Sequence, residues 1–443
     1  MERTLLSLGC WLLLGGLLSA QQRAYFQQEL RYEIAVQLDD QTHVLQGEWK
    51  LDYTNHSPDS LTFLYLHLWP NAYQSRETAF SKQLLQQGDD RFFFAQEEER
   101  GALSGLAFTA DGRQTSWEPD DRHPDIARLQ LPEPLAPGAT VRLYTPFRVQ
   151  LPRYVSRSGH IGQSYYVAQW YPKPAVYDRE GWHPMPYLED GEFYSEFATY
   201  EVQLTLPYNY VVGATGALQT ADERPFLIGR SIATEQHFVE DITTLFRGGP
   251  EKLSTPPSSD SLKTIRFKAE QVHDFAWFAD KNFQVLHETV ERPDSSTIDL
   301  WVLFTRVDEQ LWKNVPAFAR RALAFYSDQL GPYPYPQLTI VQNPYAERGG
   351  MEYPMITLID RTQDEEELDL VIAHEIGHNW LYGILANNER EHPWMDEGIN
   401  TFYENRYREM HYDAARLTDY LGNFLANGSD LRLDETYYLM QAR

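Results

Sequence analysis

The segment His374-Glu375-Ile376-Gly377-His378 is the feature that most constrains the fold of this chain. Two histidines four residues apart lie on one face of an α-helix, with Cβ atoms about 5–6 Å apart. Both imidazoles can therefore reach one Zn²⁺, which binds imidazole nitrogen at about 2.0–2.1 Å. Glu375 lies between them, beside the metal but not ligating it, where a general base for an activated water is needed. The segment thus predicts a helix that carries part of a zinc site.

The flanking residues have the pattern of a helix that packs by one face. Residues 362–365 (Thr-Gln-Asp-Glu) read as a capping box, and the acidic residues at 364–367 complement the helix dipole. Gly383 is the predicted end. An apolar stripe at intervals of four turns both histidines roughly to the opposite side. The stripe consists of Leu368, Ile372, Ile376 and Trp380. An accidental match on a surface helix, expected in about one chain of this length in a hundred, is the alternative.

A third zinc ligand has to come from another segment. The next carboxylate at the start of a predicted helix is Glu397, and Asp396 before it reads as the N-cap of that helix. Glu404 lies two turns further on the same face. There it could accept a hydrogen bond from the free nitrogen of a zinc-bound histidine, although a solvated surface glutamate is the alternative.

This spacing resembles the gluzincin zinc site, and in particular that of the M1 family of metallo-aminopeptidases. A second motif, Gly-Gly-Met-Glu-Tyr at residues 349–353, resembles the family's Gly-x-Met-Glu-Asn exopeptidase signature. The resemblance implies one zinc per chain, held by His374, His378 and Glu397. It also implies that Glu352 binds the free α-amine of a peptide. The residues before it, Gly349, Gly350 and Met351, would form an edge that pairs with the peptide backbone.

The chemistry of Glu352 agrees with that role. A buried carboxylate near zinc gains a charge-assisted hydrogen bond only from a substrate whose first residue carries an ammonium group. An internal peptide bond would leave the carboxylate unpaired, at a cost of about 1–3 kcal/mol. The sequence therefore predicts a zinc aminopeptidase that hydrolyses the N-terminal bond of peptides through a metal-activated water, with Glu375 as base. A thermolysin-like endopeptidase and a non-catalytic peptide-binding protein on the same scaffold are the alternatives.

The chain also departs from the family pattern. Tyr353, Ile384 and Asp396 stand where the family usually or often has asparagine, although none of these changes removes a ligand or the base. The family's transition-state tyrosine, in a Tyr-x-Lys-Gly-like context, has no counterpart here. Tyr437 and Tyr438 fall too early for it. We therefore expect the catalytic domain to be C-terminally incomplete, ending before that tyrosine.

The first 20 residues read as a cleavable signal peptide: Arg3, a largely apolar run, then Ser19-Ala20. The protein is therefore expected to be secreted or periplasmic, and the M1 enzymes that it resembles are of the secreted bacterial type. The apolar run is short for a bilayer span, so no stable membrane insertion is expected after cleavage. The single cysteine, Cys10, lies inside this segment, which excludes disulfides and thiolate zinc ligands from the mature protein. The net charge of −26 argues against nucleic acid and anionic membrane surfaces as partners.

The remaining sequence predicts an α+β protein of more than one domain. Its 443 residues, 42% hydrophobic and 14% aromatic, can bury more than one core. Residues 21–286 read as β structure, with clear alternation at 32–38. Residues 287–443 read as a strand at 297–304, a helix near 310–330, a strand at 338–342 and then the zinc helix. By resemblance, these parts are an N-terminal β-sheet saddle and a thermolysin-like catalytic domain.

Gln169 is a further candidate for substrate contact. It lies in the aromatic segment 165–172, in the region where M1 enzymes place a substrate-contacting glutamine. The resemblance makes it a candidate for the pocket of the substrate amine or first side chain. An aromatic-rich packing loop between the domains is the alternative.

Overall fold

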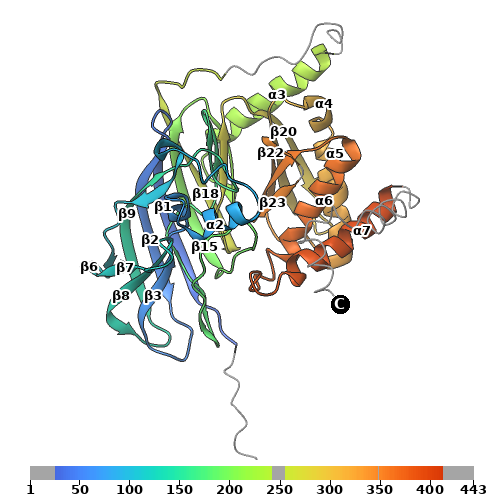
Figure 1. The fold of residues 1–443 in the computed structure, drawn as a ribbon. Helices are drawn as coiled ribbons and strands as arrows, with labels where there is room; N and C mark the ends of the chain where they lie inside the picture. Colours follow the sequence, from blue (N-terminus) through green and yellow to red (C-terminus); the bar gives the residue numbers. More distant parts are fainter. Residues whose placement is uncertain (1–24, 242–254, 348, 413–443) are drawn as a thin grey trace, which may run out of the picture.

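The computed structural model describes residues 25–241, 255–347 and 349–412. The predicted signal peptide, Cys10, Tyr437 and Tyr438 lie outside these residues. The described chain forms an N-terminal multi-sheet β domain and a mixed α/β domain that lie side by side (Figure 1). The expected α+β multidomain architecture is confirmed.

The N-terminal domain is built on a nine-stranded sheet. In β1 every second side chain is buried, as the alternation at 32–38 predicts. β1 pairs parallel with β15 and antiparallel with β2. In spatial order the strands are β17 (Ala217–Leu218), β18 (Leu262–Val272), β15 (Ala198–Pro207), β1 (Glu29–Asp39), β2 (Val44–Thr54), β9 (Thr140–Gln150), β5 (Thr109–Ala110) and β6 (Arg113–Gln114), with β4 (Ala102–Ser104) also on β9.

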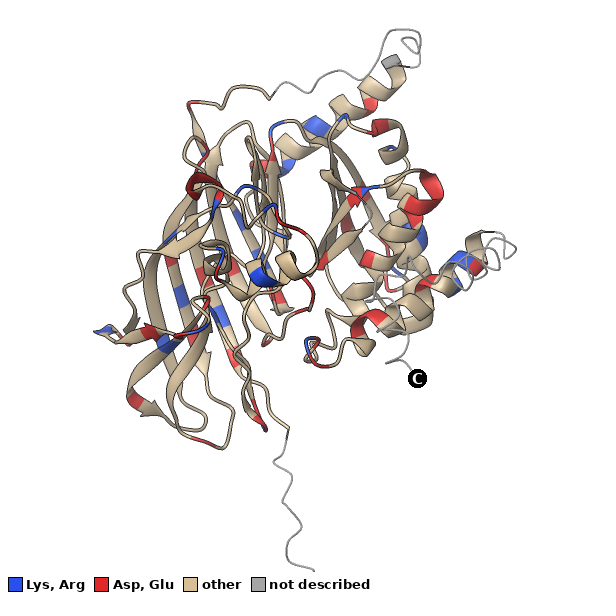
Figure 2. Ribbon diagram, viewed as in Figure 1, with Lys and Arg blue, Asp and Glu red and all other residues tan. Residues whose placement is uncertain are grey.

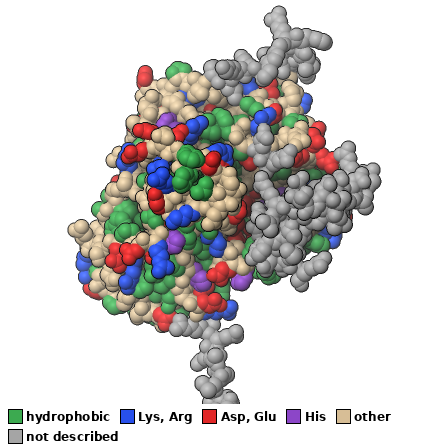
Figure 3. All heavy atoms as spheres, viewed as in Figure 1, with side chains coloured by type: hydrophobic (Ala, Val, Ile, Leu, Met, Phe, Trp, Pro, Cys, Tyr) green, Lys and Arg blue, Asp and Glu red, His purple; other side chains and the backbone are tan. Residues whose placement is uncertain are grey.

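Smaller sheets complete this domain. One has the order β10 (Gly159–Ile161), β11 (Ser164–Val167), β19 (Trp277–Asp280), β16 (Val211–Ala214). Another has the order β12 (Lys173–Pro174), β3 (Leu61–His67), β8 (Ile126–Leu135), β7 (Trp117–Pro119), and β13 (Tyr177–Asp178) pairs with β14 (Gly181–Trp182). A short helix, α2 (Ala79–Gln86), is capped by the Thr78 side chain. Charged side chains of both signs are spread among hydrophobic ones on the face seen in Figure 3.

One element corrects the expectation of continuous β structure up to residue 286. Residues Glu223–Asp241 form a helix, α3, which packs against β20 of the second domain. Its buried positions include Glu223, Leu227, Ser231 and Thr234, at helical spacing. Because three of these four side chains are polar, the buried face leaves a weak hydrophobic periodicity in the sequence.

The second domain contains a five-stranded mixed sheet. Its order is β20 (Gln284–Glu291), β21 (Thr297–Phe304), β22 (Gln337–Glu347), β24 (Ile356–Arg361), β23 (Gly350–Tyr353). The predicted strand at 297–304 coincides with β21, whereas the expected domain boundary at 286/287 falls inside β20. The predicted helix near 310–330 is divided into α4 (Glu309–Trp312) and α5 (Val315–Leu330), with Pro316 in the first turn of α5.

The helix that was predicted to carry the two histidine ligands is α6 (Glu365–Leu381), which packs against α5 and against α7 (Ile399–His411). All four residues of the predicted apolar stripe are buried. Its N-cap is Asp364, whose side chain accepts a hydrogen bond from the Glu367 amide, and not Thr362 as the capping-box interpretation had it. Gly377 allows the close packing with α7, since a Cβ there would lie 2.2 Å from Asn400 Oδ1.

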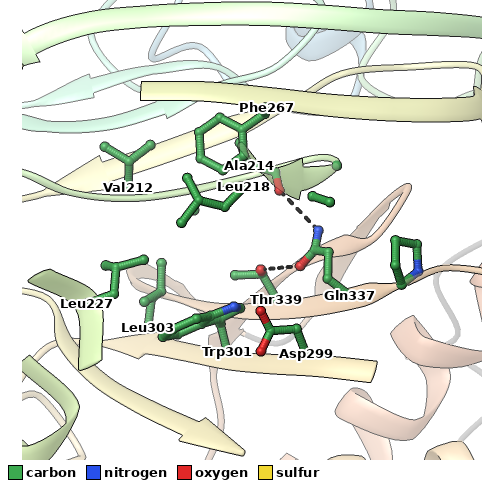
Figure 4. A pocket seen from close by; sticks show the side chains of 14 residues that line it. Val212, Ala214, Leu218, Leu227, Phe267, Asp299, Trp301, Leu303, Gln337 and Thr339 are labelled. Atoms are coloured by element: carbon green, nitrogen blue, oxygen red, sulfur yellow. Dashed lines mark hydrogen bonds between the residues drawn. The ribbon is translucent and has the colours of Figure 1, made fainter. Parts of the chain in front are cut away.

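The two domains share one hydrophobic core, whose buried residues come from both. At the junction drawn in Figure 4, Gln337 Nε2 donates to the Ala214 carbonyl at 3.3 Å and Thr339 Oγ1 donates to Gln337 Oε1 at 2.8 Å. Gly213 lies so near Leu303 that a Cβ would approach its Cδ1 to 2.7 Å. None of the helices in the described part of the chain is long and apolar enough to cross a bilayer.

Candidate active site

Three side chains from two elements converge as candidate metal ligands. α6 presents His374 and His378, whose Nε2 atoms lie 3.0 Å apart. Glu397, in a π-helical turn (Trp394–Gly398) before α7, brings its Oε2 to 3.4 Å from His374 Nε2 and 3.8 Å from His378 Nε2. One ligand atom from each of the three residues lies within 4.8 Å of the other two. The structure therefore brings together all three predicted ligands.

The other ring nitrogens of the histidines face carboxylates. His374 Nδ1 lies 3.2 Å from Glu404 Oε2, as the helical spacing of Glu404 predicts, and His378 Nδ1 lies 2.6 Å from Asp396 Oδ1. A proton on each Nδ1 can be donated to its carboxylate, which leaves both Nε2 lone pairs directed at each other. Two facing lone pairs and a carboxylate form a donor set that fits Zn²⁺, with a position left for another ligand.

The surrounding charges favour a cation at this point. Burial lowers the pKa of His378, but Asp396 and Glu397 more than offset it and raise that pKa to about 10. Burial raises the pKa of Glu397, while the two histidines lower it further, to about 2. The carboxylates thus stabilise positive charge between the imidazoles, whether it is carried by protons or by a metal ion.

Asp396 does not act as the predicted helix cap. Asp396 is completely buried, and α7 begins only at Ile399. A carboxylate in the first turn of a helix usually caps an amide, which is why the sequence suggested that role. Here the π-helical turn directs the side chain to His378 instead. Its position next to Glu397 in the sequence was the only signal for a role in the metal site.

Glu375 stands beside the metal ligands and is 4% exposed. Its Oε2 has no hydrogen-bond partner among the described residues. Burial raises the pKa of this carboxyl to about 8, with His374 lowering it and Glu352 raising it. Gly350 lies against it, because a Cβ on Gly350 would lie 2.3 Å from Glu375 Oε1. A carboxylate in this state can take up and release a proton near neutral pH.

The Gly-Gly-Met-Glu segment forms the edge of the site. β23 is the last strand of its sheet, so it presents backbone groups that an extended peptide can pair with. Glu352 on this strand is 7% exposed, and its carboxylate groups with Glu375 and His378 within 4.8 Å. Burial raises its pKa. The structure therefore brings Glu352, Gly349, Gly350 and Met351 to the same place as the metal ligands.

Two residues of the N-terminal domain also belong to the site, and the sequence gave no signal for them. Glu192 lines the cleft, and Arg157 holds it through Nη1 to Oε2 at 2.8 Å and Nη2 to Oε1 at 2.5 Å. Arg390 Nε donates to the Glu192 carbonyl at 2.9 Å. The positive charge of Arg157 lowers the pKa values of Glu352 and Glu397.

The structure does not bring Gln169 to the cleft. This residue is buried, has a positive φ of 47°, and donates from Nε2 to Asp274 Oδ2 at 3.3 Å. Tyr171 donates to the same aspartate at 3.0 Å, and Lys173 pairs with it at 3.3 Å. The aromatic segment thus packs around a buried polar network, and Gln169 is not among the described residues that line the cleft.

The cleft has a volume of about 620 Å³. It is lined by residues of α6, of the edge strand β23 and of α7. Its lining is Glu192, Gly349, Gly350, Met351, Glu352, Asp364, Glu366, Glu367, Leu370, Val371, His374, Glu375, Glu397, Glu404 and Arg408. A cleft of this size accommodates a short peptide.

Comparisons with known proteins agree with this geometry. Residues 317–435 match a family model described as the Peptidase family M1 domain. Similar sequences include leukotriene A-4 hydrolase of Xenopus laevis, 34% identical over 103 residues, and leucine aminopeptidase 2 of Aspergillus fumigatus, 37% identical over 87 residues. The matches cover 22% and 17% of this chain and only 17% and 14% of the respective relatives.

Solved structures share the fold over nearly the whole chain. A two-domain M1 zinc metallopeptidase bound to L-arginine aligns with a TM-score of 0.55 at 17% identity, covering 93% of this chain and 76% of that one. An M1 zinc metallopeptidase from Deinococcus radiodurans bound to a Tyr-Ser-Ala substrate aligns with a TM-score of 0.54 at 16% identity, covering 90% and 76%. These structures share the fold of the chain, and the sequence resemblance to the M1 peptidase domain is confirmed for residues 317–435.

Proposed function

We propose that this chain, a metallopeptidase with a Peptidase family M1 domain, is a zinc-dependent aminopeptidase that hydrolyses the N-terminal bond of peptides. The observation that carries the proposal is the position of Glu352. Its buried carboxylate lies with Glu375 and His378 in a group spanning 4.8 Å, so a substrate amine bound there would have its first peptide bond beside the metal ligands.

His374, His378 and Glu397 would hold the ion. When bound, Zn²⁺ supplies a Lewis acid that polarises the scissile carbonyl and lowers the pKa of a water molecule. Glu404 and Asp396 fix the two imidazoles so that their Nε2 atoms face the ion. Two carboxylates that are not themselves metal ligands thus orient the two histidine ligands.

Glu375 acts as the proton carrier. Its Oε2, which has no hydrogen-bond partner among residues 25–241, 255–347 and 349–412, can accept a proton from the attacking water, and the raised pKa lets the same carboxyl return that proton to the leaving amine. Gly350 keeps space beside this carboxylate, since any Cβ at that position would collide with it.

Glu352 and β23 bind the substrate. An ammonium group at Glu352 forms a charge-assisted hydrogen bond, and the desolvated carboxylate has no such partner in an internal peptide segment. The backbone of Gly349, Gly350 and Met351 pairs with the extended peptide. Arg157 offsets part of the repulsion between Glu192, Glu352 and Glu397, which lets these carboxylates share one cleft.

Blocking the substrate amine tests the proposal. We expect the zinc-loaded protein to hydrolyse an amino-acyl chromogenic amide, and to lose most of its kcat/KM on the N-acetylated form. Glu352→Ala should remove this discrimination, whereas Glu365→Ala, on an exposed position outside the cleft, should keep it. Equal rates on the free and acetylated substrates would instead favour the thermolysin-like endopeptidase.

We also propose that the protein is exported. The support is the sequence of residues 1–20 alone, with Arg3, the apolar run and Ser19-Ala20. N-terminal sequencing of the protein recovered from outside the producing cell should begin near residue 21. Recovery of an intact Met1 from the cytoplasm would contradict export.

A further inference from the structure

The hairpin of β23 and β24 carries Glu352 and packs against α6. In Figure 2, which has the same view as Figure 1, the acidic positions of this hairpin and of α6 are red. Tyr353 pairs with Ile356, so the strands are joined by a two-residue turn, Pro354 and Met355. Both turn residues are buried. The conformation of this turn therefore influences where Glu352, at the end of β23, comes to lie.

The turn is not of a kind that a hairpin favours by itself. A proline holds φ near −65°, which excludes the type I′ and II′ turns that two-residue hairpins prefer. Met355 has a φ of 64°, so Pro354 and Met355 match the central positions of a type II turn, the second of which usually holds glycine or asparagine. In a methionine this left-handed conformation brings Cβ close to the following carbonyl oxygen. Contacts from outside the hairpin are therefore needed to hold the turn.

Asn379 of α6 makes such a contact. Its Oδ1 accepts a hydrogen bond from the Met355 amide at 3.1 Å, and its Nδ2 donates to the Ile376 carbonyl at 3.1 Å. Asn379 and Met355 are both buried, so bulk water does not compete for this bond. In the sequence, Asn379 directly follows His378. The turn of the hairpin is thus bonded to the residue next to a candidate metal ligand.

The carbonyl of Met355 is bound from the opposite direction. It accepts hydrogen bonds from the Thr339 amide at 2.9 Å and from Gln337 Nε2 at 3.2 Å. Gln337 Nε2 also donates to the Ala214 carbonyl of the N-terminal domain, as drawn in Figure 4. These bonds fix the turn to β22 and to the N-terminal domain, whereas the bond to Asn379 fixes it to α6.

The strand also meets α6 at its other end. Gly350 lies against Glu375, since a Cβ on Gly350 would lie 2.3 Å from Glu375 Oε1. Glu375 and Asn379 are four residues apart, or about 6 Å along the helix axis. Glu352 lies between these two contacts, with its carboxylate within 4.8 Å of ligand atoms of Glu375 and His378. A shift of the turn would therefore move this carboxylate relative to the metal ligands.

Resting on the proposed aminopeptidase function, we propose that Asn379 is a positioning residue. Through the Met355 amide it sets the place of Glu352 relative to the metal ligands, and thereby the strength of the preference for a free α-amine. Asn379 is not among the described residues that line the cleft, so it acts through Glu352 and not by contact with the peptide. A displacement of about 1 Å in such a group can cost about 10²-fold in rate.

The test measures the ratio of kcat/KM on an amino-acyl chromogenic amide to kcat/KM on its N-acetylated form. Both rates come from the same protein sample, so the ratio does not depend on the folded fraction. Asn379→Leu has a similar shape and lacks both hydrogen bonds. We expect it to lower the ratio about 10- to 100-fold, through slower turnover of the free-amine substrate, with zinc Kd within threefold of wild type. A ratio within twofold of wild type overturns the inference.

Two matched variants separate positioning from stability. Asn379→Asp keeps an acceptor for the Met355 amide and should retain the ratio within about threefold. Trp380→Phe alters the next residue of α6, whose indole donates to the Gly331 carbonyl at 2.9 Å. It should lower Tm and leave the ratio unchanged. An equal fall of the ratio in Trp380→Phe and Asn379→Leu would overturn the assignment to Asn379.

A double-mutant cycle tests whether Asn379 acts through Glu352. In the Glu352→Ala background, Asn379→Leu should leave the ratio unchanged, because the group that it positions is gone. A further 10-fold fall in that background overturns the inference. Strong discrimination by the wild type that Asn379→Leu does not weaken overturns it as well, and leaves the aminopeptidase proposal standing. A wild-type ratio near one instead refutes the aminopeptidase proposal, and this inference falls with it.

Discussion

The hydrogen bond between His378 and Asp396 should control zinc affinity more strongly than its counterpart at His374. The first bond is 2.6 Å long between side chains that are 1% and 0% exposed, whereas His374 and Glu404 are 3.2 Å apart and 21% and 17% exposed. A hydrogen bond to a charged group contributes about 1.5–3 kcal/mol, and exposure to water reduces that value. Glu404 also forms an ion pair with Arg408, at 3.2 Å, so its charge is partly neutralised.

The isosteric variants Asp396→Asn and Glu404→Gln remove the charge and keep an acceptor. A free-energy loss of about 1.4 kcal/mol weakens binding tenfold. Losing the charged hydrogen bond in Asp396→Asn should therefore raise the zinc Kd about 10- to 100-fold, which is the range usual for groups that orient metal ligands. The zinc Kd of Glu404→Gln should rise by less than about 10-fold. Competition against a chromophoric chelator measures both Kd values. Circular dichroism of the zinc-free variants verifies that each remains folded.

Two outcomes would refute this reasoning. One is an Asp396→Asn protein whose zinc Kd lies within threefold of wild type. The other is a larger loss in Glu404→Gln than in Asp396→Asn. Either result would mean that the length and burial of the bond between histidine and carboxylate do not determine how well the ligand is oriented.

Three further predictions concern the base, the edge strand and a buried acid. Glu375→Gln should retain zinc but lower kcat about 10²–10⁴-fold, and turnover within a few-fold of wild type would exclude Glu375 as the base. Gly350→Ala should lower kcat/KM with zinc content unchanged, since its Cβ would lie 2.3 Å from Glu375 Oε1, and unaltered kinetics would contradict this. Burial raises the pKa of Glu196 from 4.5 to about 8, so the native state binds this proton more tightly than the unfolded state. Its stabilising contribution is therefore complete below about pH 4.5 and lost as pH rises through about 8. Urea unfolding should show Glu196→Gln gaining stability relative to wild type between about pH 5 and about pH 9, and a constant difference would refute the shift.

The parts of the site that are close in sequence could be predicted from it. His374, Glu375 and His378 belong to one helix, where spacing alone fixes the relative positions of side chains. The same helical rule placed Glu404 two turns beyond Glu397. β21 and the apolar stripe of α6 were predictable for a similar reason, since each repeats within a single element.

The remaining parts depend on contacts between distant segments. Glu192 reaches the cleft from the other domain, where Arg157 binds it, and no local pattern distinguishes either residue from an ordinary surface charge. Asp396 was interpreted as a cap because a buried π-helical turn has no recognisable sequence signal. α3 was missed because its buried face is largely polar. In each case the side chain or helix face contacts residues that are distant in the sequence, so the local sequence pattern does not reveal the contact.

The contacts of Arg390 have a consequence for how the two domains communicate. This residue lies in the loop that leads from α6 to Glu397, and its guanidinium donates to the backbone carbonyls of Pro186, Gly191 and Glu192 in the N-terminal domain. Any free energy that metal binding contributes to ordering this loop is therefore shared with a segment about 200 residues earlier in the chain. A sequence change in that distant segment therefore alters metal affinity by the difference between its effects on the metal-bound and the metal-free states. Residues that influence zinc affinity are therefore expected in both domains and not only in the domain that carries the ligands.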